Sequence, residues 1–449
     1  MKFGIDEALQ ILADSCSFPL YIVGGFVRDS LAGLKSSVTD IDICAPVSAD
    51  EFITAAKKSG AKVNSVYKNT GTVKLTLSGN GYEFTSFRSD EYVRGIHCPV
   101  KTYFTDDIFS DARRRDFKCN AVYLEIKSGK ICDPLGGAED IENKRISTVR
   151  EADRVFGEDG LRLMRLARQA GQTGFVTDGE CLDGARKNAR LICDVSAERI
   201  YTELNAILNA DLKYNVRDGH FRGLEILESI GVLDYILPEL TAGRGMAQPE
   251  KYHSYDVLGH SLRTVKYSHP SIRLAALLHD IGKPYCMKTN GNFHGHETES
   301  ARIAEEVLMR LKAPKVLTAE VIRLCATHMY DFACSARENK IRKFIVNNVD
   351  ILDKLLYLKQ ADYSACRDDT GEAPCVTKWN NIINKMREEG APFTVKELAV
   401  RGDALIKAGV PKEKTGKILR QLLCDCAIEP NLNDKQKLLT RALRYADEV

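Results

Sequence analysis

The sequence lacks any long hydrophobic run. No segment approaches the roughly 18 consecutive apolar residues that a membrane-spanning helix requires, so we expect no membrane partner. Charge of one sign is also missing: the net charge is +2 over 449 residues, and any nucleic-acid-binding surface must therefore be local. No low-complexity tract and no repeat of fixed period is present, which argues against solenoid architectures.

Cysteine is plentiful but lacks pairing motifs. The fourteen cysteines are scattered and form no C-x-x-C pair, and the N-terminus has none of the basic, apolar and small-residue regions of a signal peptide. We therefore expect reduced thiols in a cytoplasmic protein. The composition, 44% hydrophobic and 28% charged, is that of a soluble globular chain. Its length suffices for about three domains.

The first pattern with chemical content is a pair of glycines after the apolar run 21–23. They open the motif Gly24-Gly25-Phe26-Val27-Arg28-Asp29. Glycine permits backbone conformations that side chains forbid, so main-chain N–H groups can approach a phosphate closely. A turn before an edge strand would use the same residues, so the glycines alone leave both interpretations open.

Two carboxylates follow, in alternation with isoleucines. At a strand's period of two, Asp40 and Asp42 point to one face while Ile41 and Ile43 point to the core. Neighbouring carboxylates repel each other unless a cation lies between them, and their hard oxygen ligands suit Mg²⁺ bound with a substrate's phosphates. Together with the glycine motif, this pattern favours a nucleoside triphosphate site over a solvated edge strand.

The N-terminal part mixes helical and strand patterns. Helical spacing covers 5–15, 29–34 and 49–59, and strand patterns cover 62–67, 72–77, 82–87 and 121–126, with a turn at 79–81 and a polar loop at 89–101. Beyond this part nearly everything has helical periodicity. We predict an α+β chain, in which a small mixed sheet with helices precedes an all-α remainder.

Two further groups are candidates for the same site. Glu83 lies on the opposite face of its strand from Phe84 and could be a third carboxylate, although an isolated strand glutamate is often simply solvated. The consecutive arginines 113–115 could begin a solvated helix, or they could supply the bidentate donors that phosphate oxygens prefer.

A helix from about Asp153 holds Asp159 and Arg162, three residues apart on one face. As an isolated pair they would only stabilise the helix. A carboxylate beside a guanidinium also complements the edge that cytosine and adenine share, an exocyclic amine next to a ring-nitrogen acceptor, whereas uracil and guanine present the reverse polarity. The pair could therefore accept CTP and ATP and refuse UTP and GTP.

These motifs, in this order, resemble those of the bacterial-type class II tRNA nucleotidyltransferases, which add CCA to tRNA 3′ ends, and of their poly(A) polymerase relatives. The motifs are Gly24-Gly25-x-x-Arg28-Asp29 with Asp40-x-Asp42, Arg114-Arg115-Asp116-Phe117-x-x-Asn120-Ala121, Asp133-Pro134-x-Gly136-Gly137-x-x-Asp140, Glu158-Asp159-x-x-Arg162 and Ala197-Glu198-Arg199-Ile200-x-x-Glu203-Leu204. Lys118-Cys119 departs from the family's usual Thr-Ile, which puts the packing of the second motif in question.

The resemblance implies a polymerase-β-like head that transfers nucleotides with two Mg²⁺ ions and releases pyrophosphate. Asp40 and Asp42 would hold Mg²⁺, with Glu83 as a third catalytic carboxylate. The implied nucleotide-binding residues are Gly24, Gly25, Arg28, Arg114, Arg115, Asp116, Asn120, Asp159, Arg162 and Arg165. The implied partners are CTP, ATP and tRNA. The loop at 89–101 favours addition of the full CCA sequence or of its terminal A.

Histidine is concentrated in one segment: seven of the nine lie between 253 and 328. Imidazoles and carboxylates that converge from several helices can ligate divalent metals. As a set they resemble HD-domain phosphohydrolases, which implies a transition metal bound by His260, His279, Asp280 and Asp362, and a second metal at His296 and His328. His253, His269 and His294 match nothing in that pattern and are expected to be structural.

Basic residues gather again near the C-terminus, in a region similar to the part of the family that contacts tRNA. Between 401 and 420 the net charge is +4, from Arg401, Lys407, Lys412, Lys414, Lys417 and Arg420 against Asp403 and Glu413. Such a patch suits a phosphate backbone, although a solvated helix face would look the same.

We therefore expect four parts: a nucleotidyltransferase head at 1–145, a helical neck and body for nucleotide selection and RNA binding at 146–250, an HD domain at 251–370 and a helical tRNA-binding tail at 371–449. The predicted function is template-independent CCA addition to tRNA. Poly(A) synthesis, A addition alone, an HD phosphohydrolase whose head only binds RNA, and a non-catalytic RNA-binding protein stay open. The sequence does not decide the oligomeric state.

Overall fold

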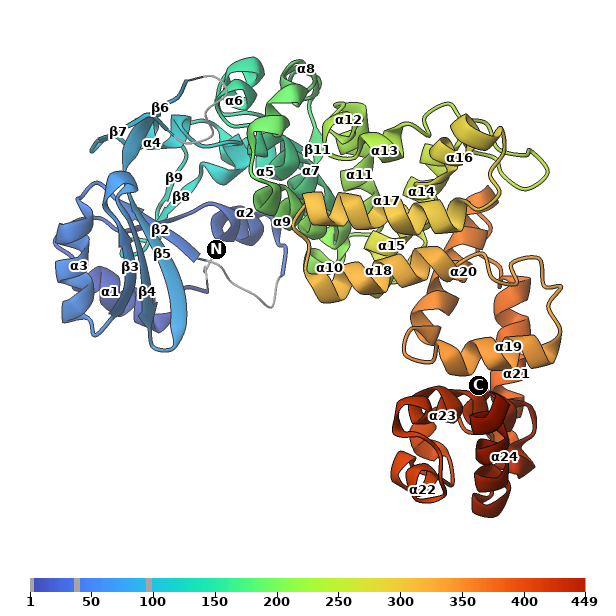
Figure 1. Ribbon diagram of the computed structural model, residues 1–449. Helices are drawn as coiled ribbons and strands as arrows, with labels where there is room; N and C mark the ends of the chain where they lie inside the picture. Colours follow the sequence, from blue (N-terminus) through green and yellow to red (C-terminus); the bar gives the residue numbers. More distant parts are fainter. Residues whose placement is uncertain (1–3, 36–40, 94–98, 449) are drawn as a thin grey trace. The chain divides into compact units, whose positions relative to one another are not determined.

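The computed structural model describes residues 4–35, 41–93 and 99–448 (Figure 1). The chain divides into two compact units, Met1–Pro238 and Glu239–Val449, and each has its own buried core. All strands of the described residues lie in the first unit. This confirms the predicted α+β class and the change to helices after the N-terminal part.

The first unit contains a seven-stranded mixed sheet with the strand order β3-β4-β5-β2-β1-β8-β9. The strands are β1 (Tyr21–Val23), β2 (Ile41–Ala45), β3 (Lys62–Tyr67), β4 (Thr72–Leu77), β5 (Asn80–Ser86), β8 (Tyr123–Glu125) and β9 (Ile131–Cys132). Strands β2 and β5 are parallel, and the other neighbouring pairs are antiparallel. The strand predicted at 121–126 is shorter, Tyr123–Glu125, and follows a 3₁₀ turn (η2) at residues 118–120.

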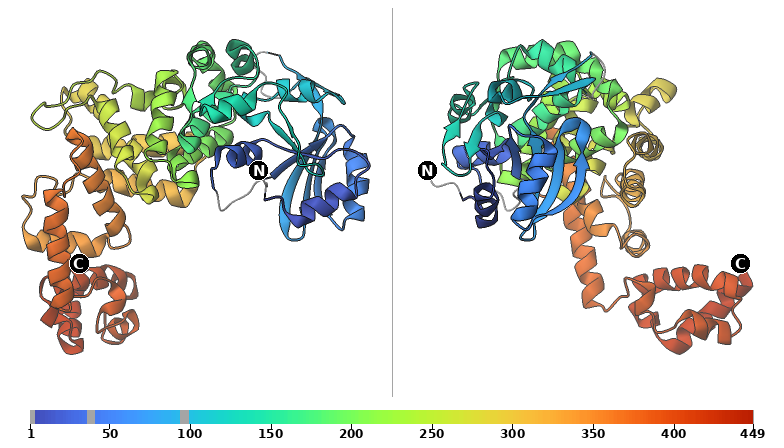
Figure 2. Two further views of the ribbon diagram at one scale, coloured as in Figure 1. Left: turned by 180° about the vertical axis from the view of Figure 1, so that it is seen from behind. Right: turned by 90° about the vertical axis from the view of Figure 1, so that its left-hand side faces the viewer.

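Helices α1 (Glu7–Asp14) and α3 (Ala49–Lys58) lie on the same side of this sheet (Figure 2). Phe52 of α3 stacks on Phe84 of β5 with ring centroids 3.6 Å apart. On β2, Ile41 and Ile43 are buried whereas Asp42 is exposed, as the alternating pattern predicted. Burial of one face therefore fixes which side of the sheet carries the polar chemistry.

The polar loop expected at 89–101 is partly wrong. Strands β6 (Arg88–Glu91) and β7 (Lys101–Phe104) pair antiparallel as a two-stranded ribbon. Polar cross-strand contacts hold it: the Thr102 hydroxyl donates to Asp90 over 3.1 Å, and the Tyr103 hydroxyl donates to Glu91 over 3.1 Å. The pattern missed the ribbon because its strands carry no apolar alternation. The rest of that loop, at 94–98, lies outside the described residues.

The remaining elements of the first unit are mostly helical. They are α2 (Gly25–Ala32), α4 (Ile108–Arg113), α5 (Gly137–Glu142), α6 (Ala152–Glu158), α7 (Leu161–Thr173), α8 (Gly179–Asn188), α9 (Ala197–Leu208), α10 (Ala210–Tyr214), α11 (Gly219–Ser229) and α12 (Leu233–Ile236), with a short parallel ribbon of β10 (Arg145–Ile146) and β11 (Val176–Thr177). Helix α13 (Pro238–Thr241) begins at the boundary of the two units.

The single helix predicted from Asp153 is wrong. Helix α6 ends at Glu158, Asp159 has an extended backbone (φ −148°, ψ 110°), and α7 begins at Leu161. Gly160 follows the break and packs so closely that an added Cβ would lie 2.4 Å from the carbonyl oxygen of Leu191. The break turns Asp159 from a mid-helix residue into one at the start of α7.

The segment 133–140 is a compact turn into α5. The Asp133 carboxylate accepts hydrogen bonds from the amides of Gly137 (2.7 Å) and Ala138 (2.9 Å), which satisfies two of the unpaired donors at the helix start. Gly137 lies against residue 118, where a Cβ would be 2.1 Å from the carbonyl oxygen. Asp140 is buried and pairs with Arg145. These residues therefore hold the end of the head rigidly onto the following segment.

The second unit is entirely helical within the described residues. Its helices are α14 (Val257–Lys266), α15 (Arg273–Leu278), α16 (Lys283–Asn290), α17 (His296–Arg310), α18 (Lys315–Thr327), α19 (Glu338–Asn347), α20 (Leu352–Arg367), α21 (Pro374–Glu388), α22 (Gly402–Lys407), α23 (Lys412–Ile428) and α24 (Lys435–Glu448). No described helix in either unit combines the length and the apolar character needed to cross a membrane. The thirteen described cysteines are all free thiols.

Candidate active site and candidate metal centre

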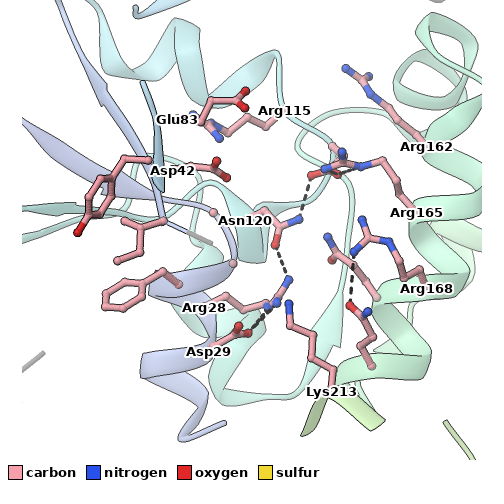
Figure 3. Close-up of a pocket in the computed structure, with 18 of the residues that line it drawn as sticks. Arg28, Asp29, Asp42, Glu83, Arg115, Asn120, Arg162, Arg165, Arg168 and Lys213 are labelled. Carbon is pink, nitrogen blue, oxygen red and sulfur yellow. Dashed lines mark hydrogen bonds and ion pairs between the residues drawn. The ribbon is translucent and has the colours of Figure 1, made fainter. Parts of the chain in front are cut away.

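A cleft of about 1100 Å³ lies within the first unit (Figure 3). It is lined by every nucleotide-site residue proposed from the sequence that the structure describes: Gly24, Gly25, Arg28, Asp42, Glu83, Arg114, Arg115, Asp116, Asn120, Asp159, Arg162 and Arg165. The remaining candidate, Asp40, lies outside the described residues. The strands of the sheet supply one side of the cleft, and helix α7 supplies arginines on the other (Figure 3).

The double glycine forms the turn into helix α2. Gly24 has φ 84° and ψ −140°, a conformation that residues with a side chain rarely adopt, and a Cβ there would lie 3.3 Å from Oδ2 of Asp42. Helix α2 starts at Gly25, so its free N-terminal amides open beside the carboxylate strand. A phosphate group is the ligand that this end of a helix favours.

Asp42 and Glu83 are neighbours on the sheet. Strands β2 and β5 are parallel and in register, with Asp42 opposite Glu83. Glu83 also lies 3.2 Å from Lys74, in an ion pair whose side chains are 44% and 52% exposed. The register thus brings together two carboxylates that the sequence could only place on separate strands, and both face the cleft.

A chain of hydrogen bonds runs from the glycine turn to helix α7. The Arg28 guanidinium donates to Asp29 (2.6 Å) and to the Asn120 side chain (2.9 Å). Asn120 in turn donates to Asp116 over 3.0 Å, and Arg165 donates to the other oxygen of Asp116 over 2.8 Å. Figure 3 shows this chain across the floor of the cleft. These hydrogen bonds fix the orientation of the side chains of Arg28, Asn120, Asp116 and Arg165.

Arg165 and Asn120 stabilise the ionised form of the Asp116 carboxyl group. Burial by itself would raise the pKa of this carboxyl group, but Arg165 and the Asn120 hydrogen bond outweigh it, and the net pKa is lower than usual. The carboxylate therefore stays ionised at neutral pH and acts as a fixed acceptor.

The arginine run is anchored rather than solvated. Arg114 and Arg115 both pair with the buried carboxylate of Asp111, at 2.8 and 3.0 Å. The Tyr123 hydroxyl donates to the same carboxylate over 2.7 Å. Burial would raise the pKa of Asp111, and the two arginines lower it well below its usual range. Both guanidinium groups are thus fixed at the cleft, where they can meet a polyphosphate.

Asp159 and Arg162 both line the cleft, but on either side of the helix break. The Asp159 carboxylate accepts from the Leu161 amide over 3.0 Å. Arg162 donates to Glu158 and to the carbonyls of residues 155 and 114. These contacts use three of the five guanidinium N–H groups, which leaves two without a hydrogen-bond partner among the described residues.

Several residues of the cleft were not identified from the sequence. Arg168, Gln172 and Lys213 line it, and Tyr214 of α10 donates a hydrogen bond to Asp29. Burial, followed by the bond to Asp29, raises the pKa of Tyr214. A basic stripe on α7 was visible in the sequence as arginines at helical spacing, but nothing local marked Tyr214, which is far from Asp29 along the chain.

The second unit brings the predicted HD residues into one buried cluster. His260 Nε2 lies 3.0 Å from an oxygen of Asp362, and Asp280 lies 3.3 Å from His279 and 3.1 Å from His296. The remaining member, His328, has its Nε2 3.3 Å from Nε2 of His296. Two overlapping triads of ligand atoms result: His260 with His279 and Asp362, and His279 with Asp280 and His328.

Three of these histidines are oriented by their own helices. Nδ1 of His279, His296 and His328 each hydrogen-bonds the carbonyl of the residue three positions earlier, at 2.8, 2.8 and 2.7 Å. A carbonyl can only accept, so each Nδ1 carries a proton, and in the neutral ring the lone pair of Nε2 is then available to the cluster. Nε2 of His279 has no hydrogen-bond partner in the described chain. This arrangement fits metal ligands.

Two polar residues at this cluster were missed. Lys283 lies 2.6 Å from Asp280, and it donates to the Gln248 side chain over 2.7 Å. Both are nearly buried. Burial would raise the pKa of Asp280, but His279 and Lys283 lower it well below its usual value. Lys283 lies three residues after Asp280 in sequence, which was a usable signal.

The basic residues of the tail lie on α22 and α23 and beside them. Arg401, Lys407, Lys412, Lys417 and Arg420 are exposed. Lys414 is half-buried and donates to the Ala446 carbonyl over 3.0 Å. Its ammonium group therefore links α23 to α24 within the tail. Their role in RNA binding stays a prediction.

Three protein families match successive segments of the chain. Residues 20–147 match the family described as "Poly A polymerase head domain", residues 174–243 match "Probable RNA and SrmB- binding site of polymerase A", and residues 253–355 match "HD domain". The fold, the cleft and these matches thus define a nucleotidyltransferase head that is followed by a helical region and an HD domain.

Characterised relatives agree with this class. The chain is 28% identical over 426 residues to the A-adding tRNA nucleotidyltransferase of Deinococcus radiodurans, which covers 89% of this chain and 90% of the relative. It is 33% identical over 240 residues to the CCA-adding enzyme of Geobacillus sp. strain WCH70, which covers 53% of this chain and 55% of that enzyme. The chain thus spans about half the length of the CCA-adding relative.

Among solved structures, the CCA-adding enzyme of Bacillus stearothermophilus in complex with CTP has a TM-score of 0.67 at 24% identity, covering 100% of this chain and 99% of that one. This likeness shows a shared fold. The three domain matches confirm the resemblance predicted from the sequence motifs: the chain carries a poly A polymerase head domain and an HD domain, and it is similar over most of its length to an A-adding tRNA nucleotidyltransferase.

Proposed function

We propose that this protein adds C and A nucleotides, without a template, to the 3′ end of tRNA, completing CCA from CTP and ATP. The observation that carries the proposal is the convergence in one cleft of a carboxylate pair, an anchored arginine pair and the Asp159 and Arg162 groups. Each group suits a different part of a nucleotide: metal-bound phosphates, free phosphate oxygens and the base.

Asp42 and Glu83, with Asp40 two residues before Asp42 in sequence, fit a Mg²⁺ site. Their carboxylates are hard oxygen ligands on adjacent strands in register. Bound Mg²⁺ would lower the pKa of the attacking hydroxyl group and neutralise the triphosphate charge. The chain's own part is positional: the start of α2 and the anchored Arg114 and Arg115 hold the phosphates, and fixed donors stabilise the charge of the transition state.

Base selection would come from the break between α6 and α7. The two remaining N–H groups of Arg162 can donate to the ring nitrogen of cytosine or adenine, and Asp159 can accept from the exocyclic amine. Uracil and guanine would place a donor opposite Arg162. Since Arg162 is held by Glu158 and two carbonyls, it reads the base from a fixed position.

Addition of A alone is the second candidate. It is supported by the A-adding enzyme of Deinococcus radiodurans, whose alignment covers 89% of this chain, whereas the CCA-adding enzyme of Geobacillus sp. strain WCH70 aligns over 53%. The two candidates share the whole cleft and differ only in whether CTP is used.

The test is incubation of purified protein with tRNA transcripts ending before CCA, after C or after CC, each with labelled CTP or ATP. Incorporation of two C and one A supports the proposal. Extension only of the CC transcript by one A would replace it with A addition, and long A tracts without CTP use would replace it with poly(A) synthesis. Product length and sequence decide.

The controls are matched carboxylate variants. Asp40→Ala with Asp42→Ala should abolish incorporation, and Asp50→Asn, on the exposed first turn of α3 outside the cleft, should keep it. If the protein were instead a phosphohydrolase with an RNA-binding head, the double variant would keep its main activity and His279→Ala would lose it. A non-catalytic RNA-binding protein would respond to neither.

We further propose a divalent transition metal at the HD cluster. His260, His279, Asp280 and Asp362 would bind the first ion, with His296 and His328 at a second position; the fit rests on the Nε2 atoms that face the carboxylates. Removal of Asp280 should abolish stoichiometric binding of Mn²⁺ and leave nucleotide incorporation intact. Retention of Mn²⁺ by Asp280→Asn would contradict the assignment.

The remaining assignments are proposals of the same kind. The four parts are 1–145, 146–250, 251–370 and 371–449, with tRNA held at the tail by Arg401, Lys407, Lys412, Lys414, Lys417 and Arg420. Replacement of the exposed members by Gln should weaken tRNA binding and reduce its salt dependence. The free thiols suit the reducing cytoplasm.

A further inference from the structure

His253, expected to be structural, lies beside the HD cluster rather than apart from it. Its ring centroid is 5.0 Å from that of His260, with the rings nearly perpendicular. The neighbouring amide of Ser254 donates to the carbonyl of Cys366 over 2.8 Å, which holds this loop against helix α20. His253, His260 and Cys366 each offer one ligand atom, and these three atoms lie within 4.8 Å of one another.

His260 differs from the other histidines of the cluster. His279, His296 and His328 each anchor Nδ1 on a carbonyl of their own chain. Nδ1 of His260 has no hydrogen-bond partner among the described residues, although the side chain is fully buried, and Nδ1 of His253 also lacks one. Two buried nitrogens without partners beside a thiol are costly unless something binds them.

We propose that His253, His260 and Cys366 form a further cation site, distinct from the carboxylate-rich HD cluster and sharing His260 with it, which takes a thiophilic divalent ion such as Zn²⁺. Two imidazoles and a thiolate are the donor set that Zn²⁺ prefers, whereas Asp280 and Asp362 give the HD cluster harder oxygen ligands. In a tetrahedral zinc site the ligand atoms are about 3.3–3.6 Å apart. The three atoms here lie within 4.8 Å of one another, so a bound ion would draw them closer together.

The helix spacing supports the shared histidine. Cys366 lies four residues after Asp362 on α20, so both face the same side of that helix. Asp362 lies 3.0 Å from Nε2 of His260. Asp362 of the HD cluster and Cys366 of the proposed site therefore lie on one helix face beside His260. Nε2 of His260 contacts Asp362, and Nδ1 is left for the proposed ion.

Binding would exchange a proton for the ion. The Cys366 thiol donates to the Asp362 carbonyl over 3.3 Å, so it carries a proton before the ion binds. When the ion binds, the S–H bond breaks, its proton leaves to solvent and a metal–sulfur bond forms, with no change of oxidation state. The neutral His253 ring has one lone pair to offer the ion.

The test is titration of the full-length, chelator-treated protein with Co²⁺, read as thiolate-to-cobalt absorption. We expect a band that saturates at one equivalent, persists in Asp280→Asn, and is lost in Cys366→Ser. The matched control is Cys334→Ser, which removes a similarly half-buried thiol of the same unit outside the cluster and should keep the band. Absence of a thiolate band in the wild type, or its persistence in Cys366→Ser, would overturn the proposal.

A second measurement needs no variant. Alkylation of the wild-type protein, followed residue by residue by mass spectrometry, should be slowed at least tenfold by Zn²⁺ at Cys366 and left unchanged at Cys334. Equal rates with and without Zn²⁺ at Cys366 would refute the site even if the variants failed to fold. Nucleotide incorporation by Cys366→Ser should match the wild type, so failure of this proposal is distinguishable from failure of the proposed function.

Discussion

Asn120 shows how one residue can connect two motifs that the sequence presents separately. Its carbonyl oxygen accepts from Arg28 and its amide donates to Asp116. A side chain that must both accept and donate in fixed directions cannot be replaced by Asp, which would place two carboxylates together. The motif spacing identified Asn120 as a site residue, but its dual contact appears only in the folded cleft.

The role of Glu83 can be tested against its ion pair with Lys74. If Glu83 is a metal ligand, Glu83→Gln should lower nucleotide incorporation about 10²–10³-fold, the usual loss when a group that stabilises the transition state is removed, and should raise the Mg²⁺ concentration needed for half-maximal activity. An exposed ion pair alone is worth at most about 1 kcal/mol.

The comparison variant is Lys74→Met, which removes only the other half of that ion pair. Under the metal-ligand assignment its effect on incorporation should be much smaller than that of Glu83→Gln, with no change in Mg²⁺ dependence. Similar small effects of both substitutions would instead show that Glu83 acts only in the ion pair with Lys74.

The lowered pKa of Asp116 predicts how the free energy of unfolding depends on pH. Its pKa in the folded protein is lowered, net of burial, by Arg165 and Asn120, whereas in the unfolded chain it is about 4. The stabilisation from this carboxylate is therefore fully present above pH of about 4 and is lost as pH falls below that value, by up to about 1.4 kcal/mol per pH unit for one group.

We expect Asp116→Asn to be less stable than the wild type at pH 6 and the difference to narrow between pH 4 and pH 3. Urea unfolding at these pH values measures it. A difference that is independent of pH would show that Asp116 stabilises by packing and hydrogen bonding alone.

At the scale of elements, the decisive feature is the break between α6 and α7. Gly160 allows the chain to pass close to Leu191, and the break places Asp159 at the start of α7 beside Arg162. A continuous helix would have kept the same spacing in sequence, but Asp159 would have lacked its bond to the Leu161 amide.

Gly160→Ala tests the break. The added Cβ would lie 2.4 Å from a backbone oxygen, so the contact cannot relax cheaply, and we expect a loss of about 1–3 kcal/mol in stability together with weaker discrimination between CTP and UTP. The control is Gly179→Ala at the start of α8, where a Cβ meets nothing within 4 Å and the change should be neutral or slightly stabilising. Equal effects of the two substitutions would argue against a special role for Gly160.

At the scale of the whole molecule, the chain comprises two compact units with chemically different centres. The first unit holds the nucleotide cleft and the second holds the histidine cluster. A ligand that binds only folded protein stabilises the unit that contains its site, by about 2.7 kcal/mol at a concentration of 100 times Kd.

Calorimetry with and without chelator should therefore show two unfolding transitions, of which the metal shifts one. We expect Mn²⁺ to raise the Tm of the second unit by roughly 5–10 °C at that saturation and His279→Ala to remove the shift. CTP with Mg²⁺ should raise the other transition. A single transition that both ligands shift would mean that the two units unfold together.

Much of this protein was predictable from its sequence. Alternation around Asp42 predicted a strand with one polar face, helical periodicity after the head predicted the all-α remainder, and motif order predicted the cleft residues from Gly24 to Arg165. These inferences succeed because strand and helix periodicities are local, and because glycine and carboxylate pairs constrain the chain within a few residues.

Tertiary structure decided the rest. The register of β2 against β5 placed Glu83 beside Asp42, and Tyr214 donates to Asp29 from a helix far along the chain. The helix that local periodicity predicted from Asp153 is interrupted at Asp159, next to the closely packed Gly160. His253 joined His260 and Cys366 in the same way. Partners far apart along the chain leave no local pattern, so only the packing of the whole unit determines which of them meet.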